Sequence, residues 1–145
     1  FGGQRRTIAL DYPGYGESTF LPDATRETYA AAILAAMDAL AIGRAHVGGL
    51  SLGGVVALAI HAAAPDRCAS LILADSFAVH PEGRAIHDRS LAAARELGMR
   101  GLAEARADAL LAQPADPTLR AEVVATMSRI APAAYAVGAE AVWLA

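Results

Sequence analysis

The chain has 145 residues, of which 55% are hydrophobic and 19% charged, and its formal net charge is -3 at pH 7. This length accommodates at most one domain of ordinary size. All 12 basic residues are arginines and none of them forms a basic run, which argues against binding to nucleic acid or to an anionic membrane surface and leaves a small molecule as the expected partner.

The cysteine count bears on the cellular compartment of the protein, and the two ends of the chain bear on whether it is a piece of a longer protein. The single cysteine, Cys68, cannot form an internal disulfide and has no metal-ligand spacing, so a secreted disulfide scaffold is excluded and a reducing, cytoplasmic location is expected. The sequence opens on Phe1 and stops at Ala145 inside an alanine-rich helical pattern. We therefore expect a piece of a longer protein, truncated at both termini. No signal peptide is visible.

The first half of the chain alternates between strand and helix patterns. Residues 7–11 form a short apolar run that ends in a turn-rich loop, 12–18, and are expected to be a strand. Residues 25–42 have helical period, with Gly43 as the stop signal. The expected apolar face of this helix consists of Tyr29, Ile33, Met37 and Leu40.

A second strand is expected at 45–50, a helix at 52–64 and a third strand at 71–75. Residues 47–65 carry no charge and approach the length of a membrane span, but the glycines around Ser51 interrupt the run and argue against one. Strands that alternate with helices indicate a parallel sheet covered on both faces. The fold class is therefore α/β, with a partial parallel sheet.

The pattern changes after Ser76, where no further strand is predicted. Helices are expected over 82–97, 100–112, 118–130 and 133–144, separated by Gly98, Pro114, Pro117 and Pro132. We therefore divide the chain into a partial α/β core at 1–75 and a helical segment at 76–145, placed above the sheet as an insertion or a small helical domain.

The residues Gly49-Leu50-Ser51-Leu52-Gly53 match Gly-x-Ser-x-Gly between a predicted strand and a predicted helix, which is where a nucleophile elbow belongs. Such a serine stands on a strained turn, and the glycines at 49 and 53 provide clearance, with Gly54 as extra clearance. The Leu52 backbone N–H lies at the positive end of the next helix and can donate to an oxyanion. A phosphate loop or a purely structural turn is the alternative, but no Gly-x-Gly-x-x-Gly or Gly-Lys-Ser/Thr spacing supports a phosphate loop.

Three segments, 8–18, 45–54 and 71–75, together resemble the middle of an α/β-hydrolase. The resemblance implies that Ser51 is the nucleophile, that Leu52 supplies one oxyanion N–H and that the segment 76–145 is a cap. Segments 98–103 and 133–139 are similar to the branch around 3-oxoadipate enol-lactonase. Family members also have an earlier His-Gly loop, and an acid followed by a histidine on later strands, and none of these segments is found in this sequence.

Two of the four histidines, His46 and His61, are not expected to replace the missing base. His46 lies five residues before Ser51, on the order of 16 Å away along an extended strand, and His61 lies far along the following helix. Asp75 ends the strand at 71–75, and His80 and His87 follow it, so these residues begin at the same sheet edge as Ser51. Asp75 and His80 are the secondary candidates for the acid and the base, although Asp75 also fits a turn-capping role.

These observations predict a serine hydrolase that acts on a carboxylic ester or lactone through an acyl-enzyme, with no metal or organic cofactor. This chain, without a base, is expected to be inactive by itself. The alternatives are a non-catalytic protein that keeps the fold, or another chemistry of the same elbow: acyl transfer, cofactor-free haloperoxidation or hydrolysis of a carbon–carbon bond. Substrate identity and oligomeric state are not predicted.

Overall fold

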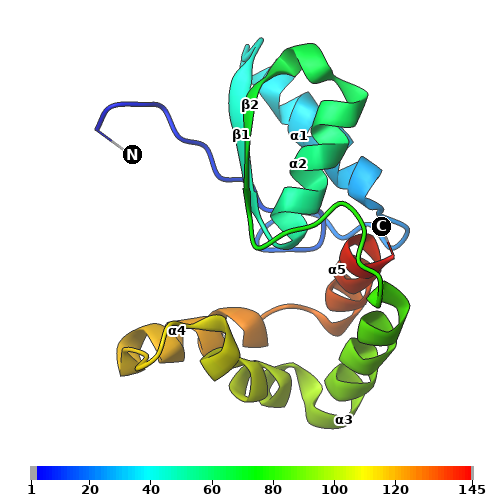
Figure 1. Ribbon diagram of the computed structural model, residues 1–145, viewed down its shortest axis with the longest axis vertical. Helices are drawn as coiled ribbons and strands as arrows, with labels where there is room; N and C mark the ends of the chain where they lie inside the picture. Colours follow the sequence, from blue (N-terminus) through cyan, green and yellow to red (C-terminus); the bar gives the residue numbers. More distant parts are fainter. Residues whose placement is uncertain (1–2, 145) are drawn as a thin grey trace.

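A computed structural model of the chain describes residues 3–144. Its elements, in chain order, are α1 (Arg26–Ala39), β1 (Ala45–Leu50), α2 (Leu52–Ala63), β2 (Cys68–Ala74), α3 (Gly83–Leu110), α4 (Pro117–Ser128) and α5 (Pro132–Trp143). Figure 1 shows the sheet with α1 and α2 in one part of the molecule, α3 and α4 in the other, and α5 between them. The predicted α/β class is confirmed.

The sheet consists of β1 and β2, which run parallel and are joined through α2. β1 spans the predicted residues 45–50, whereas β2 begins at Cys68, earlier than the predicted 71. The register pairs Val47 with Leu71 and Leu50 with Ala74. Both strands therefore end at the same edge of the sheet, which places the residues that follow them side by side.

The strand predicted at residues 7–11 is not formed. These residues have no regular secondary structure, and no strand in residues 3–144 pairs with them. The side chains of Ile8 and Leu10 are 40% and 42% exposed. An apolar run becomes a strand only when a neighbouring strand accepts its backbone hydrogen bonds, so local pattern alone was insufficient here.

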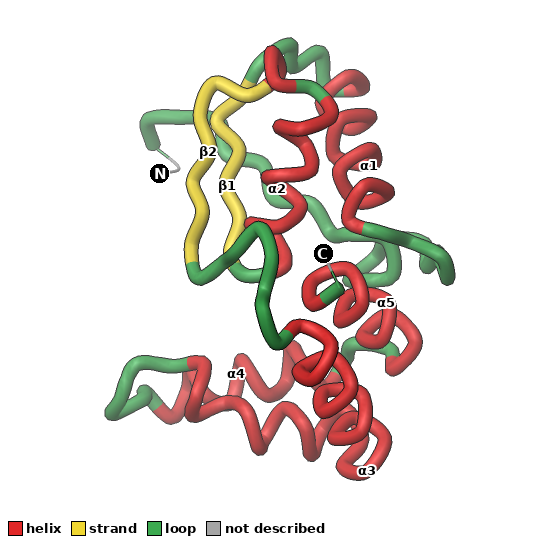
Figure 2. The backbone as a smooth tube through the Cα atoms, turned by 45° about the vertical axis from the view of Figure 1, so that its right-hand side comes forward, coloured by secondary structure: helices red, strands yellow, loops and turns green. Residues whose placement is uncertain are grey.

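The prediction that helices cover both faces of the sheet is also wrong for the described residues. In both views α1 and α2 lie on the same side of β1 and β2 (Figures 1 and 2). Val47 and Leu71 pack toward the core on that side. On the strands, Leu50 and Ile72 are 68% and 60% exposed, because no described helix lies over the other face.

α1 begins with a capping box, in which the Thr25 hydroxyl accepts from the Thr28 backbone N–H and the Thr28 hydroxyl accepts from the Thr25 N–H. This arrangement satisfies N–H groups that have no partner inside the helix. The helix ends at Ala39, before the predicted 42. After the helix, Ala41 adopts a left-handed conformation with φ 55°. The chain therefore reverses before Gly43, and the prediction that Gly43 ends the helix is wrong.

The core lies where α1, α2 and α5 meet beside the sheet. Tyr29, Val56 and Ile60 are almost completely buried there, together with Cys68 and Ala141. Burying a side chain as large as Val or Ile stabilises a fold by about 1.5–3 kcal/mol. The predicted apolar face of α1 agrees in part with this core, since Tyr29 and Met37 are buried and Leu40 is 41% exposed.

After β2 every described element is helical, as predicted. The break expected at Gly98 appears as a kink inside α3, where this glycine adopts φ 66° and ψ 171°. α3 packs on α4 and on α5, and α5 also contacts α2. Within residues 3–144, no helix combines the length and the apolar character needed to cross a bilayer.

Candidate functional site

Ser51 occupies the turn between β1 and α2, with φ 52° and ψ -118°. A positive φ is uncommon for a residue other than glycine, and such strain costs on the order of 1–3 kcal/mol. The Ser51 N–H donates to the Ala74 carbonyl of β2 at 3.0 Å, so the last bond of the parallel ladder anchors the strained residue. The side chain of Ser51 is exposed.

Two glycines are required around this turn for steric reasons. A Cβ on Gly49 would overlap the backbone of Gly53 and the nitrogen of Gly54, and a Cβ on Gly54 would overlap the side chain of Ser76. Gly53 differs from the expectation, because within residues 3–144 a Cβ there would approach the Tyr12 hydroxyl at an ordinary 3.4 Å and overlap no neighbouring group. Gly53 contributes mainly as the backbone surface on which Gly49 packs.

The Leu52 N–H is placed to receive negative charge. Leu52 is the first residue of α2, and the Gly54 and Val55 N–H groups of the same turn donate to the Ser51 carbonyl at 2.9 and 3.3 Å. Among the described residues, the Leu52 N–H has no protein acceptor. Since a helix N-terminus carries partial positive charge, this N–H has the chemistry of an oxyanion donor beside the Ser51 hydroxyl.

No histidine within residues 3–144 is hydrogen-bonded to the Ser51 hydroxyl. The His46 ring contacts the Ser70 hydroxyl at 2.8 Å, near the opposite end of the sheet from Ser51. His61 is exposed in the last turn of α2, and His87 pairs with Asp88 at 2.8 Å. Among residues 3–144, none of these three rings is hydrogen-bonded to a residue of the elbow.

His80, the secondary candidate for a base, is engaged elsewhere. Its ring lies edge-on to Phe77 and Trp143, with centroid distances of 5.0 and 5.5 Å, and its Nδ1 accepts from the Glu82 N–H at 3.1 Å. In the neutral ring the proton is then carried by Nε2. Neither nitrogen of a neutral His80 has a free lone pair in this arrangement, so here it joins the start of α3 to the end of α5.

Asp75 lies at the same sheet edge as Ser51, as predicted. It follows directly after the Leu50 and Ala74 pair and adopts φ 45°. Its carboxylate is exposed and has no hydrogen-bond partner among residues 3–144. The next residue, Ser76, donates its hydroxyl to the Ser51 carbonyl at 2.9 Å. Sequence reasoning missed this contact, because only the pairing register of β1 and β2 places residue 76 beside the elbow.

α5 lies against the elbow and the preceding loop. The Tyr15 hydroxyl donates to the Ala134 carbonyl at 3.2 Å, and a Cβ on Gly138 would overlap that hydroxyl and approach the Leu52 side chain to 3.7 Å. Burial raises the pKa of Tyr15, so the phenol stays a neutral donor. Tyr12 also has a pKa raised by burial, and its ring stacks on that of Tyr29 at 5.1 Å.

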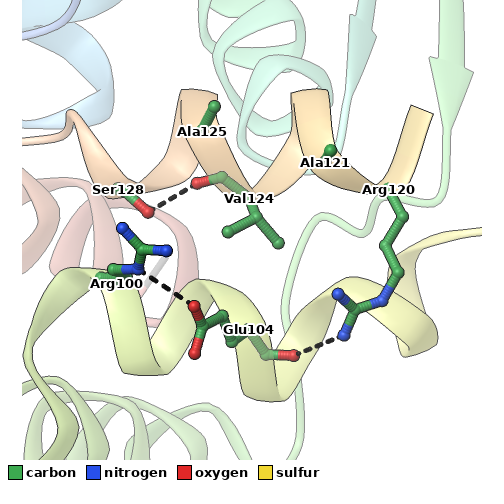
Figure 3. A pocket seen from close by; sticks show the side chains of 7 residues that line it. All are labelled: Arg100, Glu104, Arg120, Ala121, Val124, Ala125 and Ser128. Carbon is green, nitrogen blue, oxygen red and sulfur yellow. Dashed lines mark hydrogen bonds and ion pairs between the residues drawn. The ribbon is translucent and has the colours of Figure 1, made fainter. Parts of the chain in front are cut away.

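A cavity of about 500 Å³ opens between α3 and α4. Figure 3 shows Arg100 and Arg120 on its two sides, with Val124 between them. Arg100 pairs with Glu104 at 3.0 Å, and Arg120 pairs with Asp108 at 2.8 Å. No residue of the elbow or of β2 lines this cavity, so it is separate from the candidate nucleophile.

Residues 3–144 contain no group of three or more His, Cys, Asp or Glu side chains that could hold a metal ion. The arrangement at the elbow is instead suited to nucleophilic chemistry by an exposed hydroxyl on a strained turn, next to an unoccupied N–H donor.

Comparison with known sequences agrees with this geometry. A family model described as alpha/beta hydrolase fold matches residues 3–106. The chain is 45% identical over 71 residues to the dihydrolipoyllysine-residue acetyltransferase component of the acetoin cleaving system of Pseudomonas putida, covering 48% of this chain and 19% of that protein. It is 40% identical over 70 residues to the 2-hydroxy-6-oxononadienedioate/2-hydroxy-6-oxononatrienedioate hydrolase of Burkholderia vietnamiensis, covering 47% and 24%.

Solved structures extend the likeness to nearly the whole chain. A hydrolase from Pseudomonas aeruginosa PA01 superposes with a TM-score of 0.78 at 29% identity, covering 92% of this chain and 52% of that one. The enol-lactonase from Burkholderia xenovorans LB400 gives 0.72 at 27% identity, covering 93% and 53%. The chain thus spans about half the length of these hydrolases. The resemblance inferred from the three sequence segments is confirmed, and the chain belongs to the α/β-hydrolase fold family.

Proposed function

We propose that the chain is the central part of a serine hydrolase that acts on a small carboxylic ester or lactone, with Ser51 as the nucleophile. The observation that carries the proposal is the conformation of Ser51, a non-glycine residue at φ 52° whose exposed hydroxyl stands between a strand and a helix N-terminus. Strain of this kind persists only where the surroundings enforce it, and it clusters at functional sites. The hydrolases among the structural neighbours support the reaction class.

In the proposed reaction the Ser51 oxygen attacks the substrate carbonyl carbon while its proton passes to a base. The Leu52 N–H donates to the oxyanion that forms. Collapse of the tetrahedral intermediate breaks the bond to the alkoxy oxygen, which takes a proton from the conjugate acid of the base and leaves an acyl-enzyme. Water then attacks the acyl-enzyme, releasing the carboxylic acid and restoring Ser51. No metal or organic cofactor takes part in these steps.

The base and the acid of this mechanism are proposed to lie on parts of the protein other than residues 3–144. Within those residues the Ser51 hydroxyl has no histidine partner, and an unassisted serine hydroxyl is a weak nucleophile. The 145-residue chain by itself is therefore expected to show no ester turnover. Within the chain, Asp75 and His80 are only secondary candidates for these two roles, and His80 would have to leave its aromatic contacts to act as the base.

The proposal includes the division of the chain into a core at 1–75 and a cap at 76–145. The contacts of Ala134 and Gly138 with Tyr15 and Leu52 support it, because they hold α5 against the elbow, where a cap would enclose a small substrate. A cytoplasmic setting is also part of the proposal, supported by the buried free thiol of Cys68.

The test uses the whole protein that carries these residues, a fluorophosphonate probe and a panel of aryl esters and lactones. Phosphonylation should map to the peptide that contains Ser51, and Ser51→Ala should abolish both labelling and turnover. Ser70→Ala, which removes a hydroxyl that contacts His46, serves as the control and should leave both unchanged. Labelling that persists in Ser51→Ala would refute the assignment, and a whole protein with neither labelling nor turnover would favour a non-catalytic role.

Acyl transfer is the second candidate function, favoured by the acetyltransferase component that shares 45% identity over 71 residues with this chain. Both reactions pass through the same acyl-enzyme and differ in the group that removes the acyl chain. Product analysis with water alone and with an added thiol or alcohol acceptor separates them. A hydrolase releases mainly the free acid, whereas a transferase forms the new ester or thioester.

A further inference from the structure

The hydroxyl of Ser76 lies at the elbow although the residue is 25 positions away along the chain. It donates to the Ser51 carbonyl at 2.9 Å, the same oxygen that accepts from the Gly54 and Val55 N–H groups. Among residues 3–144 this carbonyl therefore has three donors, and two of them belong to the first turn of α2. The third comes from the end of the neighbouring strand.

Two further features of the chain make this contact possible. Asp75 adopts φ 45°, so the backbone reverses immediately after β2 and brings residue 76 back toward the turn. Gly54 has no side chain at the place where a Cβ would overlap the Ser76 Oγ and Cβ. The positive φ of Asp75 and the absent side chain of Gly54 thus both make room for the Ser76 hydroxyl.

The Ser51 carbonyl and the Leu52 N–H are parts of one peptide group. Because a trans peptide is planar, its C=O and N–H point in opposite directions, and the donor that fixes the Ser51 carbonyl also fixes the direction of the Leu52 N–H. A hydrogen bond to the carbonyl oxygen further polarises the peptide and strengthens its N–H as a donor. The candidate oxyanion donor is thereby oriented from its opposite side.

We infer that Ser76 is a positioning residue for the reaction, which holds the Ser51 to Leu52 peptide so that the Leu52 N–H faces the developing oxyanion. This inference rests on the proposed function of Ser51. It assigns Ser76 no contact with substrate and no transfer of a proton. The role is specific to the transition state, because the oxyanion forms only after Ser51 has attacked the carbonyl.

The experiment compares Ser76→Ala with Ser70→Ala in the whole protein, since both substitutions remove a hydrogen-bonded hydroxyl from β2 or its end. One neutral hydrogen bond corresponds to a change of about threefold to tenfold. Ser76→Ala should lower kcat by about that factor with KM within about twofold, as expected for an interaction that strengthens in the transition state. Ser76→Thr, which keeps a hydroxyl, should restore part of the rate, and Ser70→Ala should match the wild type.

A second measurement does not depend on turnover. In the isotope-labelled whole protein, Ser76→Ala should shift the carbonyl carbon resonance of Ser51 and the amide resonance of Leu52, whereas Ser70→Ala should not. Unchanged resonances, or a kcat equal to that of the wild type, would overturn the role of Ser76. If Ser51→Ala leaves turnover intact, the proposed function fails instead, and the resonances alone decide whether Ser76 orients the peptide.

Discussion

Gly49→Ala should destabilise the chain more than the size of one methyl group suggests. The Cβ would overlap the carbonyl carbon and oxygen of Gly53 and the nitrogen of Gly54. All three are backbone atoms at the start of α2, and they cannot rotate away as the end of a side chain can. Overpacking in a close-packed site costs about 1–3 kcal/mol, and a collision with backbone belongs at the upper end, about 3 kcal/mol. That loss is a large part of the roughly 5–15 kcal/mol by which domains are stable.

Gly48→Ala provides a control on the neighbouring residue of the same strand. A Cβ on Gly48 would lie 3.5 Å from the Ile72 Cβ and 3.7 Å from the Ile72 carbonyl oxygen, which are ordinary contacts. The two variants are compared by urea denaturation and by thermal unfolding of the 145-residue chain. We expect Gly49→Ala to unfold about 6–12 °C lower than the wild type and Gly48→Ala to stay within about 0.5 kcal/mol of it. Equal stabilities for the two variants would refute the steric argument for the elbow.

Three further predictions concern the same region and are measured on the 145-residue chain. Gly53→Ala should change the free energy of unfolding by less than about 1 kcal/mol, because in the described part of the chain its Cβ would approach the Tyr12 hydroxyl at 3.4 Å without overlap and alanine favours a helix. A loss as large as that of Gly49→Ala would contradict this prediction. Gly138→Ala should lower the free energy of unfolding, because its Cβ would overlap the Tyr15 hydroxyl. The decrease should be smaller in a Tyr15→Phe background, where that hydroxyl is absent. A double-mutant cycle without coupling between the two sites would count against the contact. Burial raises the pKa of Tyr15 above its value in the unfolded chain. The contribution of Tyr15 to stability should therefore be complete below about pH 10 and should decline as the pH rises above that value. Denaturation at alkaline pH should show this decline in the wild type and a smaller decline in Tyr15→Phe.

The sequence was most informative where chemistry depends on neighbouring residues. The elbow needed only a strand, a helix and small residues close to Ser51, all of which are visible within 45–64. The kink at Gly98 was likewise predictable from one glycine inside a helical pattern. Such features can be predicted from the sequence because the backbone torsions they require are determined by a few neighbouring residues.

The same reasoning failed where an element depends on a partner. Residues 7–11 have the apolar pattern of a strand, yet no strand of the described chain accepts their hydrogen bonds. The prediction of a sheet covered on both faces failed for a related reason, since an apolar strand does not specify on which side the following helix packs. Gly43 was expected to end α1, but the reversal occurs at Ala41.

By itself, the sequence determined the order of the elements from α1 to β2, the position of the turn that carries Ser51 and the family to which the chain belongs. Tertiary structure alone decided that Ser76 donates to the Ser51 carbonyl, that the absent side chain of Gly54 leaves room for Ser76, and that α5 lies against the elbow. The physical reason is that torsion preferences and apolar periodicity act over a few residues, whereas these contacts follow from the register of two strands and the packing of helices far apart in sequence. The sequence therefore identifies the candidate nucleophile, and the fold identifies the groups that hold it in place.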